Sequence, residues 1–144
     1  MTYYLDTSAL VKLYISEAGS EQVDAVIAQA EITGTSLIAY PETLSAFSRK
    51  YREHLFDRKA YHRMRRAFEN DWRRVHVIGF TREISRSAGR LIHRHGLRSF
   101  DAIHLATALY LKAQLSIPVT FLCFDERLSK AAKTEGMGED TRRR

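Results

Sequence analysis

The stretch SFDAIHLATALYLKA, residues 99–113, is the segment that decides the fold of this chain. Its length and its apolar content predict a largely buried helix, yet a carboxylate, Asp101, stands in the first turn. An Asp near a helix N-terminus accepts hydrogen bonds from backbone N–H groups and complements the helix dipole. Taken alone, Asp101 is therefore better explained as a structural cap than as a catalytic group.

The rest of the chain alternates short apolar segments with helical patterns. Strands are expected at 3–6, 32–37, 75–80 and 119–124, and helices at 8–15, 20–30, 41–54, 59–73, 81–96, 99–113 and 126–135. Pro41 suits the first position of its helix, Thr81 suits a cap and Gly96 a helix end. Strands separated by helices pair in parallel. We therefore predict a three-layer α/β/α sandwich with a short, mainly parallel central sheet.

Length and composition indicate one domain. A chain of 144 residues, 44% hydrophobic, can bury one core, and we expect a domain over 1–138 followed by a disordered tail, 139–144. The apolar runs fall short of the roughly 18 residues of a membrane span, and no signal peptide is visible. Cys123, the single cysteine, forms no internal disulfide and argues against a structural zinc site. The sequence thus predicts a cytoplasmic protein with no membrane partner.

Acidic residues stand at the junctions between the predicted strands and helices. Asp6 ends the first strand, Asp125 follows the last, and Glu42 and Asp101 lie in the first turns of their helices. The carboxyl ends of parallel strands meet at one edge of a sheet, where ligands bind. We therefore expect these four carboxylates to share one crevice.

Capping alone does not explain four acids. Thr81 shows that an uncharged cap suffices at a neighbouring junction, and Thr7, Ser8 and Ser99 stand ready to cap beside Asp6 and Asp101. Crowded carboxylates repel one another and raise one another's pKa values. Such a cluster is typical of a site for a hard cation such as Mg²⁺, which prefers oxygen ligands.

The positive charge of the chain is concentrated in one segment. The formal net charge is +6, and residues 49–74 hold ten Lys or Arg and four Asp or Glu, so the remaining residues balance to zero. Tyr51, Phe56, Tyr61, Phe68 and Trp72 are interleaved with these charges. Two interpretations are equally favoured: an RNA-binding surface that includes Arg63, Arg65 and Arg66, or solvated helices whose aromatic side chains face the core.

Four motifs together resemble a known family. They are YLDTSALVKLY at 4–14, PETLSAFSR at 41–49, LRSFDAIHLATAL at 97–109 and FLCFDERLSKAAKTEG at 121–136. Their order and separation resemble the PIN-domain family, and more narrowly the VapC-type toxin ribonucleases of toxin-antitoxin pairs.

The resemblance implies a PIN-like fold and a hydrolase that cleaves RNA phosphodiester bonds with Mg²⁺ or Mn²⁺. It assigns the metal-binding and catalytic acids to Asp6, Glu42, Asp101 and Asp125, and an accessory hydroxyl to Thr7 or Ser8. It also implies a homodimer and a cognate antitoxin.

The roles within the site stay open at this point. Asp6, Asp101 and Asp125 are expected to hold the ion, whereas Glu42 is a further ligand, acts through a water or serves as a base. His104 lies on the same side of its helix as Asp101, but a core histidine packed among apolar neighbours is the favoured interpretation.

Other functions fit the sequence less well. A haloacid dehalogenase-type phosphatase needs a second Asp two residues after the first, where this chain has Ser8. A response-regulator receiver needs an Asp after the third strand, where the chain reads GFT. The remaining alternative is a non-catalytic PIN-like module that binds RNA or a protein without cutting.

Overall fold

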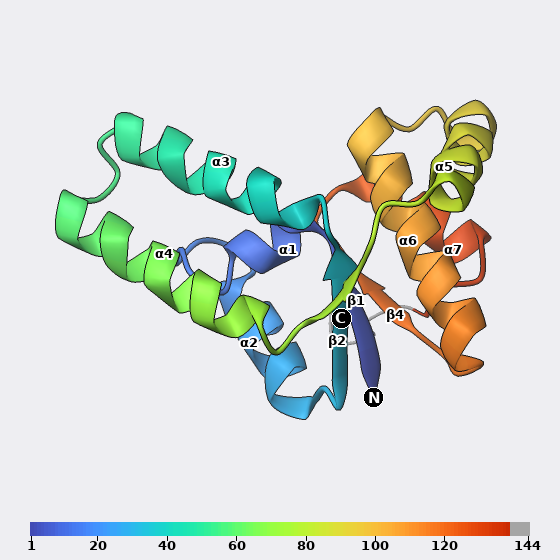
Figure 1. Cartoon of the computed structure of the whole chain (residues 1–144), viewed down its shortest axis with the longest axis horizontal. Helices are drawn as coiled ribbons and strands as arrows, with labels where there is room; N and C mark the ends of the chain where they lie inside the picture. Colours follow the sequence, from blue (N-terminus) through green and yellow to red (C-terminus); the bar gives the residue numbers. More distant parts are fainter. Residues whose placement is uncertain (139–144) are drawn as a thin grey trace.

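The computed structural model describes residues 1–138, so the predicted tail, 139–144, lies outside the described residues. Four strands form one sheet: β1 (Thr2–Leu5), β2 (Ile32–Ser36), β3 (His76–Ile78) and β4 (Thr120–Leu122). Their order across the sheet is β3-β2-β1-β4, and all three pairings are parallel. The carboxyl ends of the strands consequently lie at one edge of the sheet (Figure 1).

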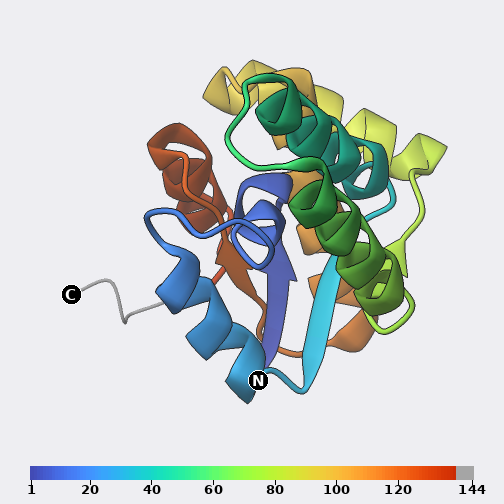
Figure 2. The same ribbon diagram turned by 90° about the vertical axis from the view of Figure 1, so that its left-hand side faces the viewer.

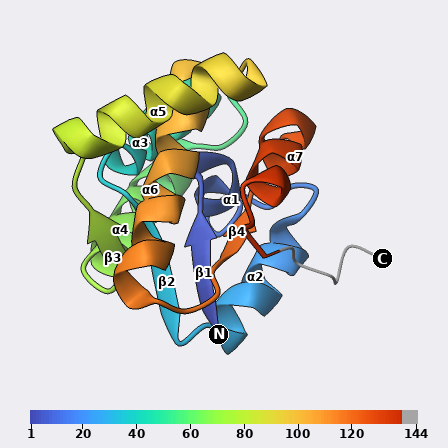
Figure 3. The same ribbon diagram turned by 90° about the vertical axis from the view of Figure 1, so that its right-hand side faces the viewer.

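Helices cover both faces of the sheet. One layer contains α1 (Thr7–Val11), α2 (Ser20–Gln29), α3 (Ala39–Arg52) and α4 (Arg58–Trp72), and Figure 2 looks onto this layer. The other contains α5 (Arg82–His95), α6 (Ser99–Leu115) and α7 (Glu126–Thr134) (Figure 3). The predicted three-layer α/β/α fold is confirmed. Within the described residues, no helix is both long and apolar enough to cross a bilayer.

The central strand β1 is buried on both faces. Tyr4 points into the core beneath α5, α6 and α7, where its ring stacks on Phe121 with the centroids 5.3 Å apart. Tyr3 and Leu5 belong to the opposite core, beneath α1 and α2. This alternation follows from the two-residue period of a strand, and burial on both faces is what a parallel sheet requires.

The observed elements differ from the predicted ones mainly at their ends. The helix predicted over 8–15 ends at Val11, and Pro41 is the third residue of α3 instead of the first. The strands predicted over 75–80 and 119–124 shrink to three residues each, because β3 and β4 are the outer strands of the sheet. On its outer side β4 has, within the described residues, only an isolated bridge between Thr120 and Gly138. Thr81 caps α5, and Gly96 ends it in the left-handed conformation with φ 64°, both as predicted.

Helices α3 and α4 form a hairpin that projects from the sheet (Figures 1 and 2). Near the sheet, Phe68 is buried against Phe47 and Tyr14, and Trp72 packs on Phe68. At the tip of the hairpin, Tyr51, Phe56 and Tyr61 stack on one another. Phe68 and Trp72 therefore face the core, as the second of the two interpretations predicted, whereas the stacked rings at the tip are only partly buried.

Helix α6 approaches the sheet closely because β2 has a glycine beneath it. A Cβ atom on Gly34 would lie 2.6 Å from Cδ2 of Leu111, which is itself buried in the core. This contact sets the distance between α6 and β2.

Gly34→Ala tests this close approach. The added methyl group overpacks the α6–β2 contact, so we expect the free energy of unfolding to fall by about 1–3 kcal/mol. Chemical denaturation followed by circular dichroism measures the change.

Gly89→Ala is the matched control. Gly89 lies inside α5 with no atom within 4 Å of the added Cβ, so the better helix propensity of Ala should stabilise this variant by about 0.5–1 kcal/mol. Equal stability of parent and Gly34→Ala would show that α6 can move away from the sheet at no cost.

Candidate active site

The edge formed by the carboxyl ends of the strands brings the four predicted carboxylates together. Asp6 follows β1 directly, and its backbone N–H donates to the carbonyl of Leu122 in β4 at 3.2 Å. Asp125 follows β4, while Glu42 and Asp101 lie in the first turns of α3 and α6.

The carboxylates affect one another electrostatically. Burial, with a smaller contribution from Asp101, raises the pKa of Asp6 above its ordinary value. The pKa of Asp101 is also raised, first by burial and then by the charges of Asp125 and Glu42. All four acids thus contribute to one region of negative potential.

Asp6 and Asp125 each cap a helix with one carboxylate oxygen. Oδ1 of Asp6 accepts from the backbone N–H of Ala9 at 3.0 Å and from the Ser8 hydroxyl at 2.7 Å. Oδ1 of Asp125 accepts from the backbone N–H of Leu128 at 2.8 Å. A structural role is therefore real at both positions, and it occupies one oxygen of each carboxylate.

Asp101 does not cap its helix. The cap position of α6 is Arg98, and no side chain provides a capping hydrogen bond there. Within residues 1–138, no donor forms a hydrogen bond to the Asp101 carboxylate. The interpretation of Asp101 as a cap is wrong, and Ser99, the suggested substitute, does not cap either. Asp101 is therefore a partly buried carboxylate that the fold leaves without a hydrogen-bonding role.

A chain of hydrogen bonds holds Glu42. Its Oε1 lies 2.8 Å from Nε2 of His104 and accepts from the Thr7 hydroxyl at 2.7 Å. On the other side of the imidazole, Nδ1 lies 2.8 Å from the hydroxyl of buried Tyr4. Because an ionised carboxylate only accepts, Nε2 carries a proton, and in the neutral ring Nδ1 accepts from Tyr4. Burial acts to raise the pKa of Glu42, but the bonds from His104 and Thr7 outweigh it and lower this pKa.

His104 is therefore more than a core histidine. It is buried, as predicted, but its ring joins the carboxylate cluster instead of packing only among apolar neighbours. Both ring nitrogens are engaged, so His104 orients Glu42 and offers no free nitrogen to a metal ion. The spacing of three residues between Asp101 and His104, which places both on one side of α6, was the sequence signal for this role.

The donor chemistry of the cluster fits a hard cation. Its available oxygens belong to carboxylates, and burial together with mutual repulsion makes two of these carboxylates costly to ionise without a counter-charge. The side chains do not yet form a metal site, because no three His, Cys, Asp or Glu side chains of the described chain converge on a point where an ion would fit. The carboxylates would have to move closer together to hold an ion.

Two hollows flank the first turn of α6. Asp101 and Asp125 line one of about 530 Å³, together with Arg98, Arg127 and Phe124. The other, of about 520 Å³, includes Thr7, Glu42, Arg49 and Phe100 in its lining. The turn thus separates the hollows and contributes side chains to both.

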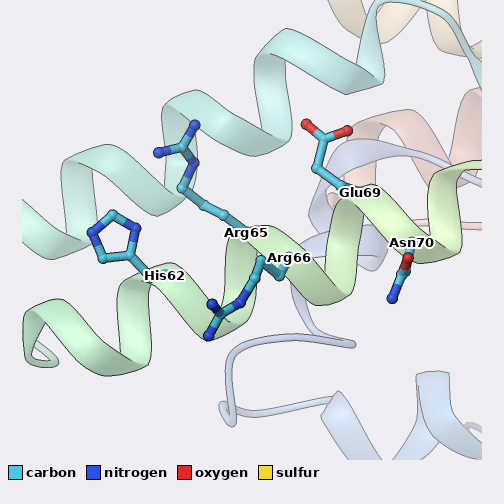
Figure 4. A pocket seen from close by; sticks show the side chains of 5 residues that line it. All are labelled: His62, Arg65, Arg66, Glu69 and Asn70. Carbon is cyan, nitrogen blue, oxygen red and sulfur yellow. The ribbon is translucent and has the colours of Figure 1, made fainter.

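The three basic residues singled out in the sequence lie elsewhere. Arg63, Arg65 and Arg66 are exposed on α4. Arg65 and Arg66 line a third hollow of about 430 Å³ with His62, Glu69 and Asn70 (Figure 4). This hollow shares no lining residue with the two beside the carboxylates, so any contact of Arg63, Arg65 or Arg66 with RNA stays a prediction.

Comparison with known proteins identifies the family of this chain. The PIN-domain family model matches residues 3–134. The chain belongs to the PIN-domain family. Ribonuclease VapC49 from Mycobacterium tuberculosis is 34% identical over 106 residues, 74% of each chain. Ribonuclease VapC46 from the same organism is 33% identical over 135 residues, 93% of this chain and 92% of the relative. These relatives place the chain among the VapC-type proteins of the family.

Solved structures share the fold at low sequence identity. Mycobacterium tuberculosis VapC20, described as a sarcin-ricin loop cleaving toxin, has a TM-score of 0.67 at 20% identity and covers 90% of this chain and 95% of its own. FitAcB from Neisseria gonorrhoeae gives 0.67 at 17% identity, covering 96% of both chains. A toxin-antitoxin complex from Klebsiella pneumoniae gives 0.55 at 21% identity, with 83% and 84% covered.

Replacing Asp101 by Asn separates repulsion from capping. The raised pKa of Asp101 means that its ionisation destabilises the folded state, so Asp101→Asn should melt at or above the parent temperature at pH 7 in metal-free buffer. The parent gains stability as the pH falls through the raised folded-state pKa, whereas the amide does not, so the difference should vanish in acid. Differential scanning calorimetry across the pH range measures both effects.

Asp57→Asn serves as the control. Asp57 caps α4 by accepting a hydrogen bond from the backbone N–H of Ala60. Asn caps a helix about as well as Asp, and Asp57 does not belong to the carboxylate cluster. We expect no gain in melting temperature for this variant. Earlier melting of Asp101→Asn at pH 7 would restore the interpretation of Asp101 as a structural residue.

Proposed function

We propose that this protein is a metal-dependent endoribonuclease that hydrolyses RNA phosphodiester bonds with Mg²⁺, or alternatively Mn²⁺. The observation that carries the proposal is the set of four carboxylates at one edge of the sheet, in which Asp101 accepts no hydrogen bond from the described residues. The names of the relatives, which are ribonucleases, support the same activity.

Asp6, Asp101 and Asp125 are the residues that we expect to hold the ion. Asp6 and Asp125 retain one carboxylate oxygen outside their caps, and Asp101 retains both. When bound, such an ion activates water and stabilises negative charge on phosphate oxygens. The ion would also offset the mutual repulsion of the carboxylates, which now raises the pKa of Asp101.

Glu42 is suited to orienting water. His104 and Thr7 both bond to its Oε1, which leaves Oε2 without a partner within residues 1–138. The lowered pKa keeps Glu42 ionised at neutral pH, so Oε2 can accept a proton or a hydrogen bond from water. Among the three roles left open by the sequence, the lowered pKa makes a base the least suitable, and Oε2 can contact the ion directly or through water.

The surroundings of the acids are suited to a polyanion. Arg98 and Arg127 line the hollow beside Asp101, and the uncapped start of α6 presents backbone N–H groups at the positive end of a helix dipole. These groups would hold phosphate oxygens close to the carboxylates. The acids alone would repel RNA, so the cations and the helix terminus set the direction of approach.

The proposal extends to partners and location. Because the relatives carry the VapC name and one structure of the same fold is a toxin-antitoxin complex, we propose that the protein is the toxin of such a pair, acts in the cytoplasm and forms a homodimer. A neighbouring reading frame that encodes a small DNA-binding protein would support the pairing, and light scattering measures the oligomeric state.

Cleavage of a structured RNA tests the activity. We expect cleavage with Mg²⁺ or Mn²⁺, none in excess EDTA, and a loss of at least roughly a hundredfold in Asp101→Asn, the scale for removing a group that stabilises transition-state charge. Mg²⁺ should also raise the melting temperature of the parent more than that of Asp101→Asn, because only a bound ligand stabilises by mass action.

Asp24→Asn makes the same chemical change on the exposed face of α2 and should leave cleavage and metal response unchanged. Undiminished cleavage in EDTA would eliminate the metal mechanism. Binding of RNA by the parent with no cleavage under any metal would favour the non-catalytic module.

Charge reversal on α4 tests the predicted RNA-binding residues. In the triple variant Arg63→Glu, Arg65→Glu and Arg66→Glu, each lost phosphate contact should lower the slope of log K against log salt by somewhat less than one. Filter binding at several salt concentrations measures the slope for parent and variant.

The control applies the same reversal to Arg82, Arg86 and Arg90, which are exposed on α5. An equal effect of both triple variants would indicate net charge instead of contact through α4. An unchanged slope in the α4 variant would make that surface a solvated face only.

A further inference from the structure

The hollow on the α3 side of the carboxylates is lined by groups of different chemistry. Ile38, Pro41 and Ala46 provide an apolar surface, Phe100 an aromatic ring and Arg49 a cation. Its volume of about 520 Å³ falls in the range of roughly 300–1,000 Å³ that is typical of small-molecule sites. Such a combination suits a flat, partly polar ligand attached to negative charge.

Phe100 has no evident role in the fold. Its side chain is 56% exposed although its neighbours in α6 form the buried core. A large exposed aromatic side chain keeps apolar surface in contact with water, which is unfavourable. Binding of a partner that covers the ring removes this free-energy cost. Phe100 directly precedes Asp101, so this exposed ring lies one residue from a proposed metal ligand.

Arg49 adds an unpaired cation to the same hollow. It is exposed on α3, two turns after Glu42, and its guanidinium forms no ion pair or hydrogen bond with other described residues. A planar guanidinium binds phosphate oxygens and also stacks on flat rings. The cation therefore complements either part of a nucleotide.

We propose that this hollow binds one unpaired nucleobase of the RNA substrate, with the base stacked on Phe100 and Arg49 contacting the adjoining phosphate. The inference rests on the proposed nuclease function and adds a substrate-positioning residue to it. Stacking on Phe100 selects a single-stranded or extruded base, because a base inside a duplex has no free face to offer.

The position of the hollow supports a nucleobase as its occupant. Thr7 and Glu42 line it and also belong to the hydrogen-bonded chain of the site. Phe100 and Glu42 line the same hollow, so a nucleotide whose phosphate lies at the carboxylates is within reach of Phe100 with its own base. An apolar protein side chain in this hollow would instead leave Arg49 without an anion.

Binding of short RNAs in the non-cleaving Asp101→Asn background tests the proposal. The probes are fluorescein-labelled decamers of uridylate, of adenylate and of abasic ribose phosphate, measured by anisotropy with Mg²⁺ present. Phe100→Ala should weaken binding of the two decamers that contain bases by about 5- to 150-fold, the range for losing one base–aromatic stack. Affinity for the abasic decamer should stay the same, and Phe100→Trp should retain the affinity for bases.

Phe80→Ala is the matched control. Phe80 is 47% exposed and does not line the hollow, so its substitution removes a similar exposed aromatic ring without changing the hollow itself. We expect no change with any decamer. Melting temperatures of all variants should match the background protein, since neither ring is buried.

Three results would overturn the proposal. Equal affinities of Phe100→Ala and its background for all decamers would exclude stacking of a base on Phe100. An equal loss of affinity for abasic and normal decamers would indicate that Phe100 contacts the RNA backbone. A change in oligomeric state on light scattering without a change in RNA affinity would assign the hollow to a second protein chain. In each case cleavage by the unmodified protein can persist, so the proposed nuclease function is judged separately by its own assay.

Discussion

Repulsion among carboxylates at one edge of a parallel sheet is the constraint on which this structure depends. Parallel pairing of all four strands places their carboxyl ends together, so acids that are far apart in sequence cannot avoid one another. The fold accommodates them in different ways: Asp6 and Asp125 accept backbone hydrogen bonds, and Glu42 is bonded by His104 and Thr7. Asp101 has no such compensation, and the proposed cation would supply it.

The architecture could be predicted from the sequence because the patterns that specify strands and helices are local and recur along the chain. Alternating strand and helix patterns specify a parallel sheet, and the sheet specifies where its junction residues meet, so Asp6 and Asp125 could be placed from their neighbours alone. Strand ends were less predictable, since the length of β3 and β4 depends on the pairing that an outer strand finds and not on its apolar content. The choice between cap and free carboxylate at Asp101 depended on which residue takes the cap position, and Arg98 does so without a side-chain bond.

Residues that act through partners distant in sequence were harder to predict. His104 bonds to Tyr4, one hundred residues earlier, and to Glu42, sixty-two residues earlier, and no local pattern indicates which side chains will meet its two nitrogens. Phe100 belongs to an apolar stretch and was indistinguishable from its buried neighbours until the structure showed it exposed. Conversely, the aromatic residues of the basic segment invited a functional interpretation, and much of that set proved to hold the α3–α4 hairpin together.

The bond between Tyr4 and His104 makes the site inseparable from the core. Tyr4 is buried in the central strand, stacks on Phe121 of β4 and contacts the imidazole that holds Glu42. The packing of α6 on the sheet thereby sets the orientation of the Glu42 carboxylate directly, through side chains of the core. The side chain of Glu42 therefore cannot turn away from His104 without breaking a bond that reaches into the core. Its orientation should persist as long as α6 stays packed on the sheet.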